Sequence, residues 1–328
     1  RDTITSRRNR PDRSSEHVCH QGRERGHAEV KLGLHALGIG AGAERPVIEA
    51  VASAAEEHGF ATLWAGEHVV MVDESASRYP YADDGRIAVP AVADWIDPMI
   101  GLSFAAAATA TIGIATGVLL LPEHNPVIVA KQAASLDRLS GGRFSLGVGI
   151  GWSREEFDAL GVPFARRGAR TAEYVAAMRT LWRDDIASYS GEFVEFADIR
   201  VNPKPLRNNG IPVLLGGNSD AALRRVARWG DGWYGFNLID CDDVADKIGI
   251  LRGHCAEAGR DPAGLRLAVA LRDPTPADMP RLAMLGVDEL VLVGSPPERA
   301  SQARAWVSEL AALWLEGRAG VCGGEGER

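Results

Sequence analysis

The chain has 328 residues, of which 46% are hydrophobic and 24% charged, and its formal net charge is −8. This composition is typical of a globular protein with a sizeable core, and the acidic balance excludes the basic footprint of a nucleic-acid-binding protein. The longest apolar run, around residues 112–121, has the size of a strand and contains glycine, so no membrane span is expected. The 4 cysteines form no C-x-x-C pair, which argues against a disulfide framework or a metal site and for a reducing cytoplasm.

The two ends of the chain differ in composition from its body. Residues 1–29 are rich in arginine, hold almost no large aliphatic residue and lack the apolar stretch of a secretory signal. Residues 317–328 are rich in glycine and charge. We therefore expect a disordered extension at 1–29, one domain at 30–316 and a disordered tail at 317–328.

Along the body, short apolar runs alternate with helical patterns. The runs show little polar alternation, as expected for parallel strands that are covered on both faces. Strands are predicted at 31–35, 61–65, 112–119, 143–148, 211–215, 232–236, 265–270 and 289–293. Helices are predicted at 46–58, 98–109, 126–139, 169–182, 219–229, 242–258, 279–285 and 297–315. This alternation predicts a (β/α)8 TIM barrel, with an open doubly wound sheet as the main alternative.

Two insertions interrupt the alternation. Residues 69–97 form a long loop after the second strand, and this loop contains Tyr79-Pro-Tyr81. Loops of this length in compact domains are usually functional lids or disordered segments. Residues 188–196 read as a hairpin before the fifth strand.

The pair Glu67-His68 follows the second predicted strand directly. The carboxyl ends of strands are where α/β folds build their sites, and the proton of histidine moves easily near neutral pH. The pair is therefore a candidate catalytic site. An exposed loop histidine beside a solvated glutamate explains the same residues equally well.

The glycines after the first strand fit a weak dinucleotide-binding pattern. Gly38-Ile-Gly-Ala-Gly-Ala43 satisfies G-x-G-x-x-A, and Glu67 lies near the position of the acidic residue that a Rossmann fold needs. However, Glu44-Arg45-Pro46 separates these glycines from the following helix, so a phosphate would not lie at the helix N-terminus. A flexible loop is the alternative explanation.

Three further segments at the ends of strands are candidate ligand contacts. Gly216-Gly-Asn-Ser219 precedes a helix, where free N–H groups and the helix dipole favour a phosphate, although a plain helix cap has the same composition. Gly147-Val-Gly-Ile-Gly-Trp152 can admit a flat ligand or simply bend the chain. Thr116-Gly-Val118 indicates that another group passes close to the backbone at this glycine. Arg154, Glu155 and Glu156 can face a ligand or begin a solvated helix.

These segments occur together, in this order, in one family. The chain resembles the bacterial luciferase-like superfamily of flavin and deazaflavin (coenzyme F420) oxidoreductases, and in particular its F420-dependent members. The resemblance covers about residues 30–315. It is carried by the segments at 59–68, 114–126, 136–143, 146–152, 214–219 and 230–233.

The resemblance implies a barrel with the cofactor at the carboxyl ends of the strands. It implies that His68 lies beside the cofactor ring, as a catalytic acid or base or as a residue that orients the substrate, and that Glu67 positions this site. It further implies a cis peptide at Gly117–Val118 that supports the ring, and a phosphate held at residues 216–219. The implied cofactor-binding residues are Thr116, Gly117, Val118, Gly149, Gly151, Trp152, Gly216, Gly217, Asn218 and Ser219.

The activity implied by the resemblance is hydride transfer between reduced F420 and a small organic substrate, with residues 69–97 as a lid. The alternatives are an FMN-dependent monooxygenase and a non-catalytic flavin-binding barrel. The sequence departs from F420 sugar-phosphate dehydrogenases, since Val72 replaces a tryptophan and Trp152 replaces a glutamate. The proton donor of those enzymes therefore does not carry over, and Glu155 or Glu156 is a candidate substitute.

A cationic patch for the tail of F420 is a further expectation. Its candidate residues are Arg166, Arg167, Arg170, Arg224, Arg225 and Arg228, with a solvated helix face as the alternative. The expected partners are a small-molecule substrate and possibly a second copy of the chain, since dimers are common in similar proteins. No nucleic acid or membrane partner is expected. We expect Trp306 and Trp314 either to contribute to an interface between two copies of the chain or to pack the last helix.

Overall fold

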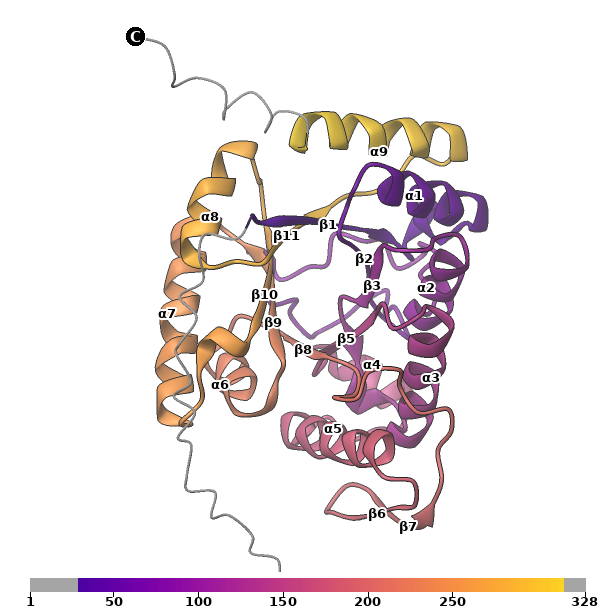
Figure 1. Cartoon of the computed structure of the whole chain (residues 1–328), viewed down its shortest axis with the longest axis vertical. Coiled ribbons are helices and arrows are strands. Elements are labelled where there is room, and N and C mark those ends of the chain that lie inside the picture. The colour runs from indigo at the N-terminus through magenta and orange to yellow at the C-terminus, as the bar shows by residue number, and fades with distance from the viewer. Residues whose placement is uncertain (1–28, 316–328) are drawn as a thin grey trace, which may run out of the picture.

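The computed structural model describes residues 29–315. The predicted terminal extensions, 1–29 and 317–328, lie outside these residues except for Glu29. In the described part, parallel strands lie at the centre and helices surround them (Figure 1).

The strands form a closed parallel barrel. Around it the order is β3-β2-β1-β11-β10-β9-β8-β5, and the pairing of β3 with β5 closes the ring. A short strand, β4, follows β3 and also pairs with β5. The predicted TIM barrel is therefore confirmed, and the alternative prediction of an open doubly wound sheet is wrong. The bounds are β1 Lys31–Leu37, β2 Thr62–Ala65, β3 Gly113–Thr116, β4 Leu119–Leu120, β5 Phe144–Gly149, β8 Val213–Gly216, β9 Gly232–Leu238, β10 Arg266–Leu271 and β11 Glu289–Val293.

All predicted helices are found within a few residues of their predicted bounds. They are α1 Arg45–Glu57, α2 Pro98–Ala107, α3 Pro126–Leu139, α5 Arg167–Arg183, α6 Asp220–Trp229, α7 Cys241–Glu257, α8 Met279–Leu285 and α9 Ala300–Trp314. A further short helix, α4 (Arg154–Ala159), lies between β5 and α5. The predicted hairpin is also present, as β6 (Ala187–Ser190) and β7 (Glu195–Ile199).

The interior of the barrel is packed with side chains. Trp64 and Tyr234 stack inside it with ring centroids 4.6 Å apart. Small residues of neighbouring strands, such as Ala115 and Ala268, leave room for these two large rings. The Trp64 indole N–H donates to Glu289 at the start of β11, 2.8 Å away. Since the interior is filled, a ligand site has to lie above it, at the carboxyl ends of the strands.

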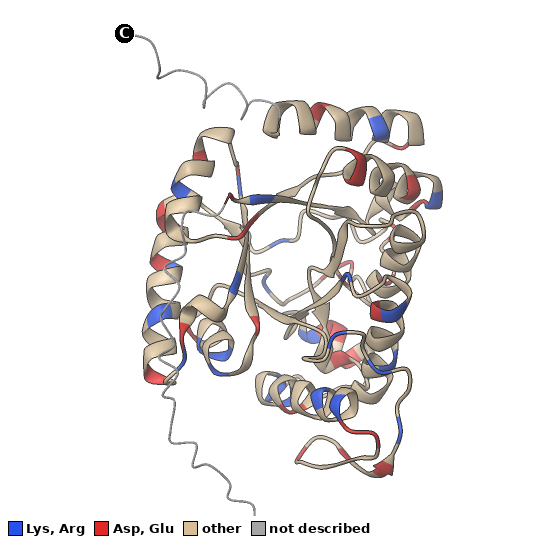
Figure 2. Cartoon of the chain, viewed as in Figure 1, with Lys and Arg blue, Asp and Glu red and all other residues tan. Residues whose placement is uncertain are grey.

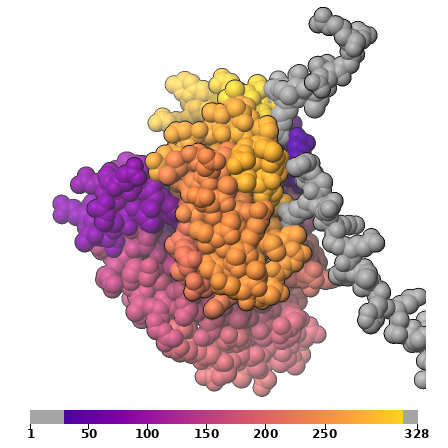
Figure 3. Space-filling model, turned by 90° about the vertical axis from the view of Figure 1, so that its left-hand side faces the viewer, coloured from indigo at the N-terminus to yellow at the C-terminus, as the bar shows by residue number. Residues whose placement is uncertain are grey.

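The glycine segment after β1 anchors the long loop that follows β2. The Gly40 N–H donates to the carbonyl of Asp94, and the Ile96 N–H donates to the carbonyl of Gly38. Residues 40–43 form a 3-10 turn, so the glycines do not lead into a helix as a phosphate-binding turn would. The closed barrel and these contacts show that the dinucleotide hypothesis is wrong. Figure 3 shows the segment after β2, in purple, projecting from one side of the molecule.

Charged residues of both signs are spread over the outer helices and loops (Figure 2). No helix within residues 29–315 is long and apolar enough to cross a membrane, and no cluster of His, Cys, Asp and Glu in this part of the chain could hold a metal ion. Cys241 and Cys255 are free thiols, whereas Cys19 and Cys322 lie outside the described residues. Trp306 and Trp314 pack against the core, which favours the packing explanation for both.

Candidate functional site

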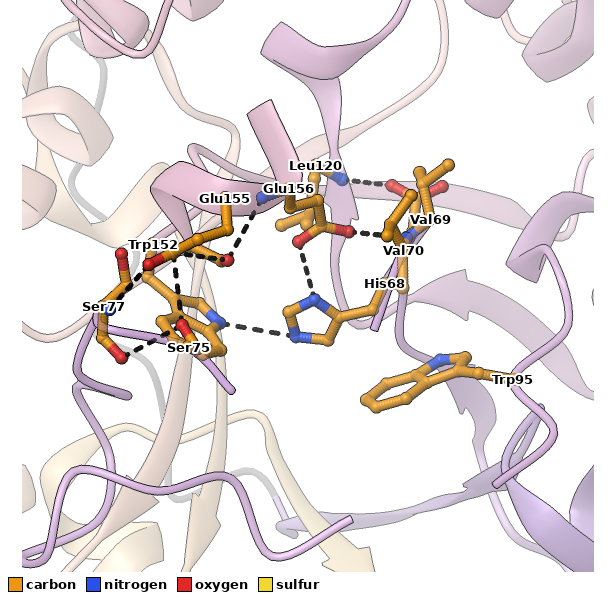
Figure 4. Close-up of polar contacts among 12 residues, drawn as sticks. His68, Val69, Val70, Ser75, Ser77, Trp95, Leu120, Trp152, Glu155 and Glu156 are labelled. Carbon is orange, nitrogen blue, oxygen red and sulfur yellow. Dashed lines mark hydrogen bonds and ion pairs between the residues drawn. The ribbon is translucent and has the colours of Figure 1, made fainter. Parts of the chain in front are cut away.

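His68 lies at the mouth of the barrel, three residues after the end of β2, and its side chain is 7% exposed. Its Nδ1 is 2.8 Å from Glu156 Oε2, and its Nε2 is 3.4 Å from Trp152 Nε1 (Figure 4). The indole N–H can only donate, so Nε2 of His68 is the acceptor and the ring proton is on Nδ1, directed to Glu156. The unprotonated Nε2 of the imidazole therefore lies against the indole N–H of Trp152.

Glu156 fixes the orientation of this imidazole. It lies in the first turn of α4, where Ser153 Oγ accepts the Glu156 N–H, and its side chain is 0% exposed. Besides His68, its carboxylate accepts the N–H groups of Val69 at 2.7 Å and Val70 at 3.1 Å. Bonds to a carboxylate near a helix N-terminus are strong. One side chain thus holds both the ring of His68 and the start of the loop after it.

Glu67 faces away from His68. Its Oε2 accepts the Leu120 N–H at 2.6 Å, and its Oε1 lies 3.0 Å from His124 Nε2. Burial opposes a charge on His124, but the hydrogen bond and the charge of Glu67 raise the pKa of His124 above its ordinary value. Glu67 thus contacts the segment after the third strand, and Glu156 is the carboxylate that contacts His68. That Glu67 positions the site stays a prediction.

Aromatic side chains surround His68. The ring centroid of Trp95 is 4.9 Å from that of His68, and the centroid of Trp152 is 5.7 Å away. Tyr79 packs edge-on against Trp152, and burial raises the pKa of its hydroxyl. Trp95 was not among the predicted site residues; it is the one tryptophan of the loop at 69–97, which is the signal that could have indicated it. These rings give the surroundings of His68 an apolar wall that excludes water.

The segment after β3 forms the floor of the site. The Gly117–Val118 peptide is cis, as the family resemblance implied. The hydroxyl of Thr116 bridges to the backbone of Gly147, donating to its carbonyl at 2.7 Å and accepting its N–H at 2.9 Å. This bridge fixes the start of the segment against β5.

Val118 explains two of the predicted ligand-contact glycines. A Cβ at Gly149 would lie 2.6 Å from Val118 Cγ2, and a Cβ at Gly216 would lie 3.0 Å from Val118 Cγ1. The space beside these glycines is therefore filled by the valine side chain rather than left open for a flat ligand. Gly151 has φ +75°, and a Cβ there would lie 2.5 Å from Phe157, so it too is required by packing.

The turn before α6 has the features of an anion cradle. Gly217 has φ +108°, and Ser219 caps the helix by accepting the Ala222 N–H at 3.3 Å. The Asn218 amide donates to the Phe236 carbonyl at 2.8 Å, while its Oδ1 is buried without a partner among the described residues. Free N–H groups at a helix N-terminus attract an anion, and the unpaired Oδ1 offers an acceptor to a bound hydroxyl or N–H group.

Arg154, Arg167 and Arg225 lack acidic partners in the described part of the chain and lie near one another, Arg225 on the helix that follows this turn. Arg167 donates to the Gly151 carbonyl at 3.0 Å and stacks on the Phe164 ring, on which Arg154 also lies. Arg225, in the second turn of α6, is half-buried; burial and then the charge of Arg167 lower its pKa. Arg154 is exposed, whereas Arg167 and Arg225 are partly buried; cations without acidic partners, above all partly buried ones, indicate a site for an anionic ligand.

Other arginines of the predicted patch have different contacts. Arg166 pairs with Glu192, and Arg224 pairs with Asp220 at 3.0 Å. Arg170 is buried and donates to the Pro163 carbonyl at 2.7 Å. Arg228 is exposed. Fewer of the predicted arginines are therefore available to an anionic ligand than the sequence indicated.

Comparison with known proteins identifies relatives of similar length. Uncharacterized protein Rv0953c of Mycobacterium tuberculosis is 40% identical over 265 residues, which cover 80% of this chain and 92% of that protein. The FMNH(2)-dependent dimethylsulfone monooxygenase of Pseudomonas putida is 32% identical over 171 residues, which cover 51% of this chain and 47% of that enzyme.

Solved structures share the fold. Monooxygenase RslO1 from Streptomyces bottropensis has a TM-score of 0.68 at 19% identity, covering 89% of this chain and 100% of that one. The coenzyme F420-dependent tetrahydromethanopterin reductase from Methanopyrus kandleri has a TM-score of 0.68 at 16% identity, covering 88% of this chain and 99% of that one. The profile of the luciferase-like monooxygenase family matches residues 32–312, and the chain therefore belongs to this family.

Proposed function

We propose that the chain is an F420-dependent oxidoreductase that transfers hydride between the deazaflavin and a small organic substrate. The observation that carries the proposal is the combination of His68, whose Nε2 is unprotonated, with the turn at 216–219 and three arginines that have no acidic partner within residues 29–315. Three positive charges are more than one phosphate needs. The relatives named above include one F420-dependent and one FMNH(2)-dependent enzyme, so the family alone does not choose between these cofactors.

The described residues fit a deazaflavin. The N–H groups of the turn at 216–219 and the α6 dipole would hold its phosphate, and Val118 would lie beneath its ring. FMN ends in one phosphate monoester, whereas F420 continues beyond its phosphate into a carboxylate tail. Arg154, Arg167 and Arg225 supply cations for such a tail. This surplus of positive charge favours F420.

When bound, the deazaflavin supplies or accepts the hydride. His68 Nε2 takes the proton of a substrate hydroxyl in the oxidation and returns it in the reduction. Glu156 balances the charge that forms on the imidazole, and its bonds to Val69 and Val70 keep it in place during the transfer. Trp95 and Trp152 confine the substrate beside His68 and exclude water.

An FMN-dependent monooxygenase is the second candidate, because the curated dimethylsulfone monooxygenase is 32% identical over half of this chain. A non-catalytic flavin-binding barrel is disfavoured by the organised contacts of His68. A protein without turnover has no need for an imidazole held in one tautomer by a buried carboxylate.

Equilibrium titration of the purified protein with F420, FMN and NADPH, followed by fluorescence, tests the proposal. We expect F420 to bind most tightly and Arg225→Gln to weaken it about 10-fold or more, since a charge-assisted contact contributes roughly 1.5–3 kcal/mol. Arg224→Gln is the matched control, because Arg224 lies next to Arg225 but is exposed and paired with Asp220. Tight binding of FMN without F420 would favour the monooxygenase, and binding of none of the three would refute the proposed function.

A further inference from the structure

Glu123 is a buried carboxyl group that has no hydrogen-bond partner. It ends the 3-10 turn η2 (Leu121–Glu123), which leads from β4 toward α3, and it is 8% exposed. Both of its carboxyl oxygens are buried without a partner among the described residues. Glu67 and Glu156, in contrast, accept backbone N–H groups. A buried, unpaired carboxylate is costly, so this residue requires a physical explanation.

The surroundings of Glu123 are apolar or negatively charged. A Cβ at Gly151 would lie 2.8 Å from Glu123 Oε1 and 2.5 Å from Phe157, so the carboxyl group lies against this glycine and near this ring. The charged groups that act on it are Glu156 from α4 and Glu67 from the end of β2. His124 directs its ring to Glu67, and within residues 29–315 no cation pairs with Glu123. Within the described part of the chain, neither a hydrogen bond nor an ion pair stabilises a negative charge on this group.

These surroundings determine its protonation state. Burial, and then the charges of Glu156 and Glu67, raise the pKa of Glu123 to about 9. At neutral pH the residue is therefore a neutral carboxylic acid. In that form it adds no third negative charge beside the carboxylates of Glu67 and Glu156.

We propose that Glu123 is a positioning residue of the candidate active site, which keeps Glu156 and His68 in place only while it carries its proton. On ionisation the O–H bond of Glu123 breaks, the proton passes to solvent and the electron pair stays on the carboxylate. The new charge repels Glu156, whose carboxylate holds Val69, Val70 and the imidazole of His68. His68 then loses the partner that fixes its tautomer, and its proton-accepting Nε2 is no longer held in place beside Trp152.

The effect on catalysis rests on the proposed function, whereas the protonation of Glu123 and its effect on His68 do not. Both are therefore measured first on the protein without cofactor. Infrared spectroscopy detects the carbonyl band of a protonated carboxylic acid. We expect this band at pH 7 in the wild-type protein, its loss with a midpoint near pH 9, and its absence in Glu123→Gln.

Glu155→Gln is the matched control for the infrared experiment. Glu155 neighbours Glu156 on α4, but hydrogen bonds, foremost that of Ser77, lower its pKa to about 2, so it is ionised at pH 7. Its replacement leaves the carbonyl band unchanged. Glu123→Met serves as a second variant if the glutamine variant does not fold. Absence of the band from the wild-type protein at pH 7 overturns the proposal, whatever the protein binds.

Nitrogen NMR of the labelled imidazoles reports on the second half of the proposal. In the wild-type protein we expect the His68 ring signals, assigned by their loss in His68→Asn, to change near pH 9, and this change to be absent in Glu123→Gln. With active enzyme, the alkaline limb of the pH–kcat profile moves in the same variant. A His68 signal with no step near pH 9, or the same step in wild type and variant, shows that Glu123 does not act through Glu156 and overturns the positioning role.

Discussion

Replacing Glu123 with glutamine removes a titrating group while keeping its size, and the structure sets how the stability of the protein changes with pH as a result. The pKa of this carboxyl is raised from 4.5 to about 9 by burial and by its acidic neighbours. The folded state thus binds the proton more tightly than the unfolded state. This contribution to stability is fully present below pH 4.5 and is lost as the pH rises from 4.5 to 9.

The size of this loss in unfolding free energy follows from the pH interval between the two pKa values. Between pH 5 and pH 8 the unfolded chain is largely ionised at Glu123 while the folded chain keeps the proton. Each pH unit therefore costs the wild-type protein about 1.4 kcal/mol, or about 4 kcal/mol over the interval. Glutamine does not titrate, and any cost of its buried amide is the same at both pH values. Relative to Glu123→Gln, the wild-type protein loses about 4 kcal/mol of unfolding free energy between pH 5 and pH 8.

Urea denaturation of both proteins at the two pH values measures this difference. Glu155→Gln is again the control, because Glu155 is ionised in the folded and unfolded states throughout the interval and its replacement has the same effect at both ends. A difference below about 1 kcal/mol between wild type and Glu123→Gln would mean that Glu123 is ionised or hydrated in the folded protein, and would refute the reasoning.

Three other substitutions test the site. Gly149→Ala places a Cβ 2.6 Å from Val118 Cγ2 and is expected to lower the unfolding free energy, measured by urea denaturation, by about 1–3 kcal/mol. An unchanged unfolding free energy would show that Val118 is loosely packed against Gly149. Glu156→Gln leaves the imidazole without its charged partner and lowers kcat about 100-fold with a small change in KM, measured by steady-state kinetics. Glu67→Gln removes the negative charge that raises the pKa of His124 and leaves a weaker, neutral hydrogen-bond acceptor, so the NMR titration midpoint of this histidine falls. A midpoint that stays or rises contradicts the assignment.

The sequence was sufficient to predict the order of strands and helices because that signal is local. An apolar run such as that of β11 and a proline-initiated helix such as α3 carry their own information. It was not sufficient to identify the partner of His68, because Glu156 is 88 residues away and belongs to a short helix. Sequence proximity favoured Glu67, whose carboxylate turns to the next strand instead.

The glycines illustrate the same limit on what a sequence can predict about a site. A glycine in a sequence indicates that a Cβ has no room or that φ is positive, but not which group fills the space. At Gly149 and Gly216 the neighbouring group is Val118. At Gly40 the backbone instead anchors the returning loop through Asp94. Only at Gly217, beside a capped helix N-terminus, does the geometry agree with the ligand hypothesis.

The three glutamates near His68 are the same residue type in three different states, and the number of donors that each one meets separates them. Glu156 accepts two backbone N–H groups and an imidazole, and Glu67 accepts one backbone N–H and an imidazole. The side chain of Glu123 meets no donor among residues 29–315. Because these donors come from segments that only the closed barrel brings together, the chemistry of each carboxyl is a property of the fold. An exchange of glutamine for glutamate at these positions is therefore expected to have three different results: loss of a charged hydrogen bond to His68, a lower pKa of His124, and a smaller loss of stability as the pH rises.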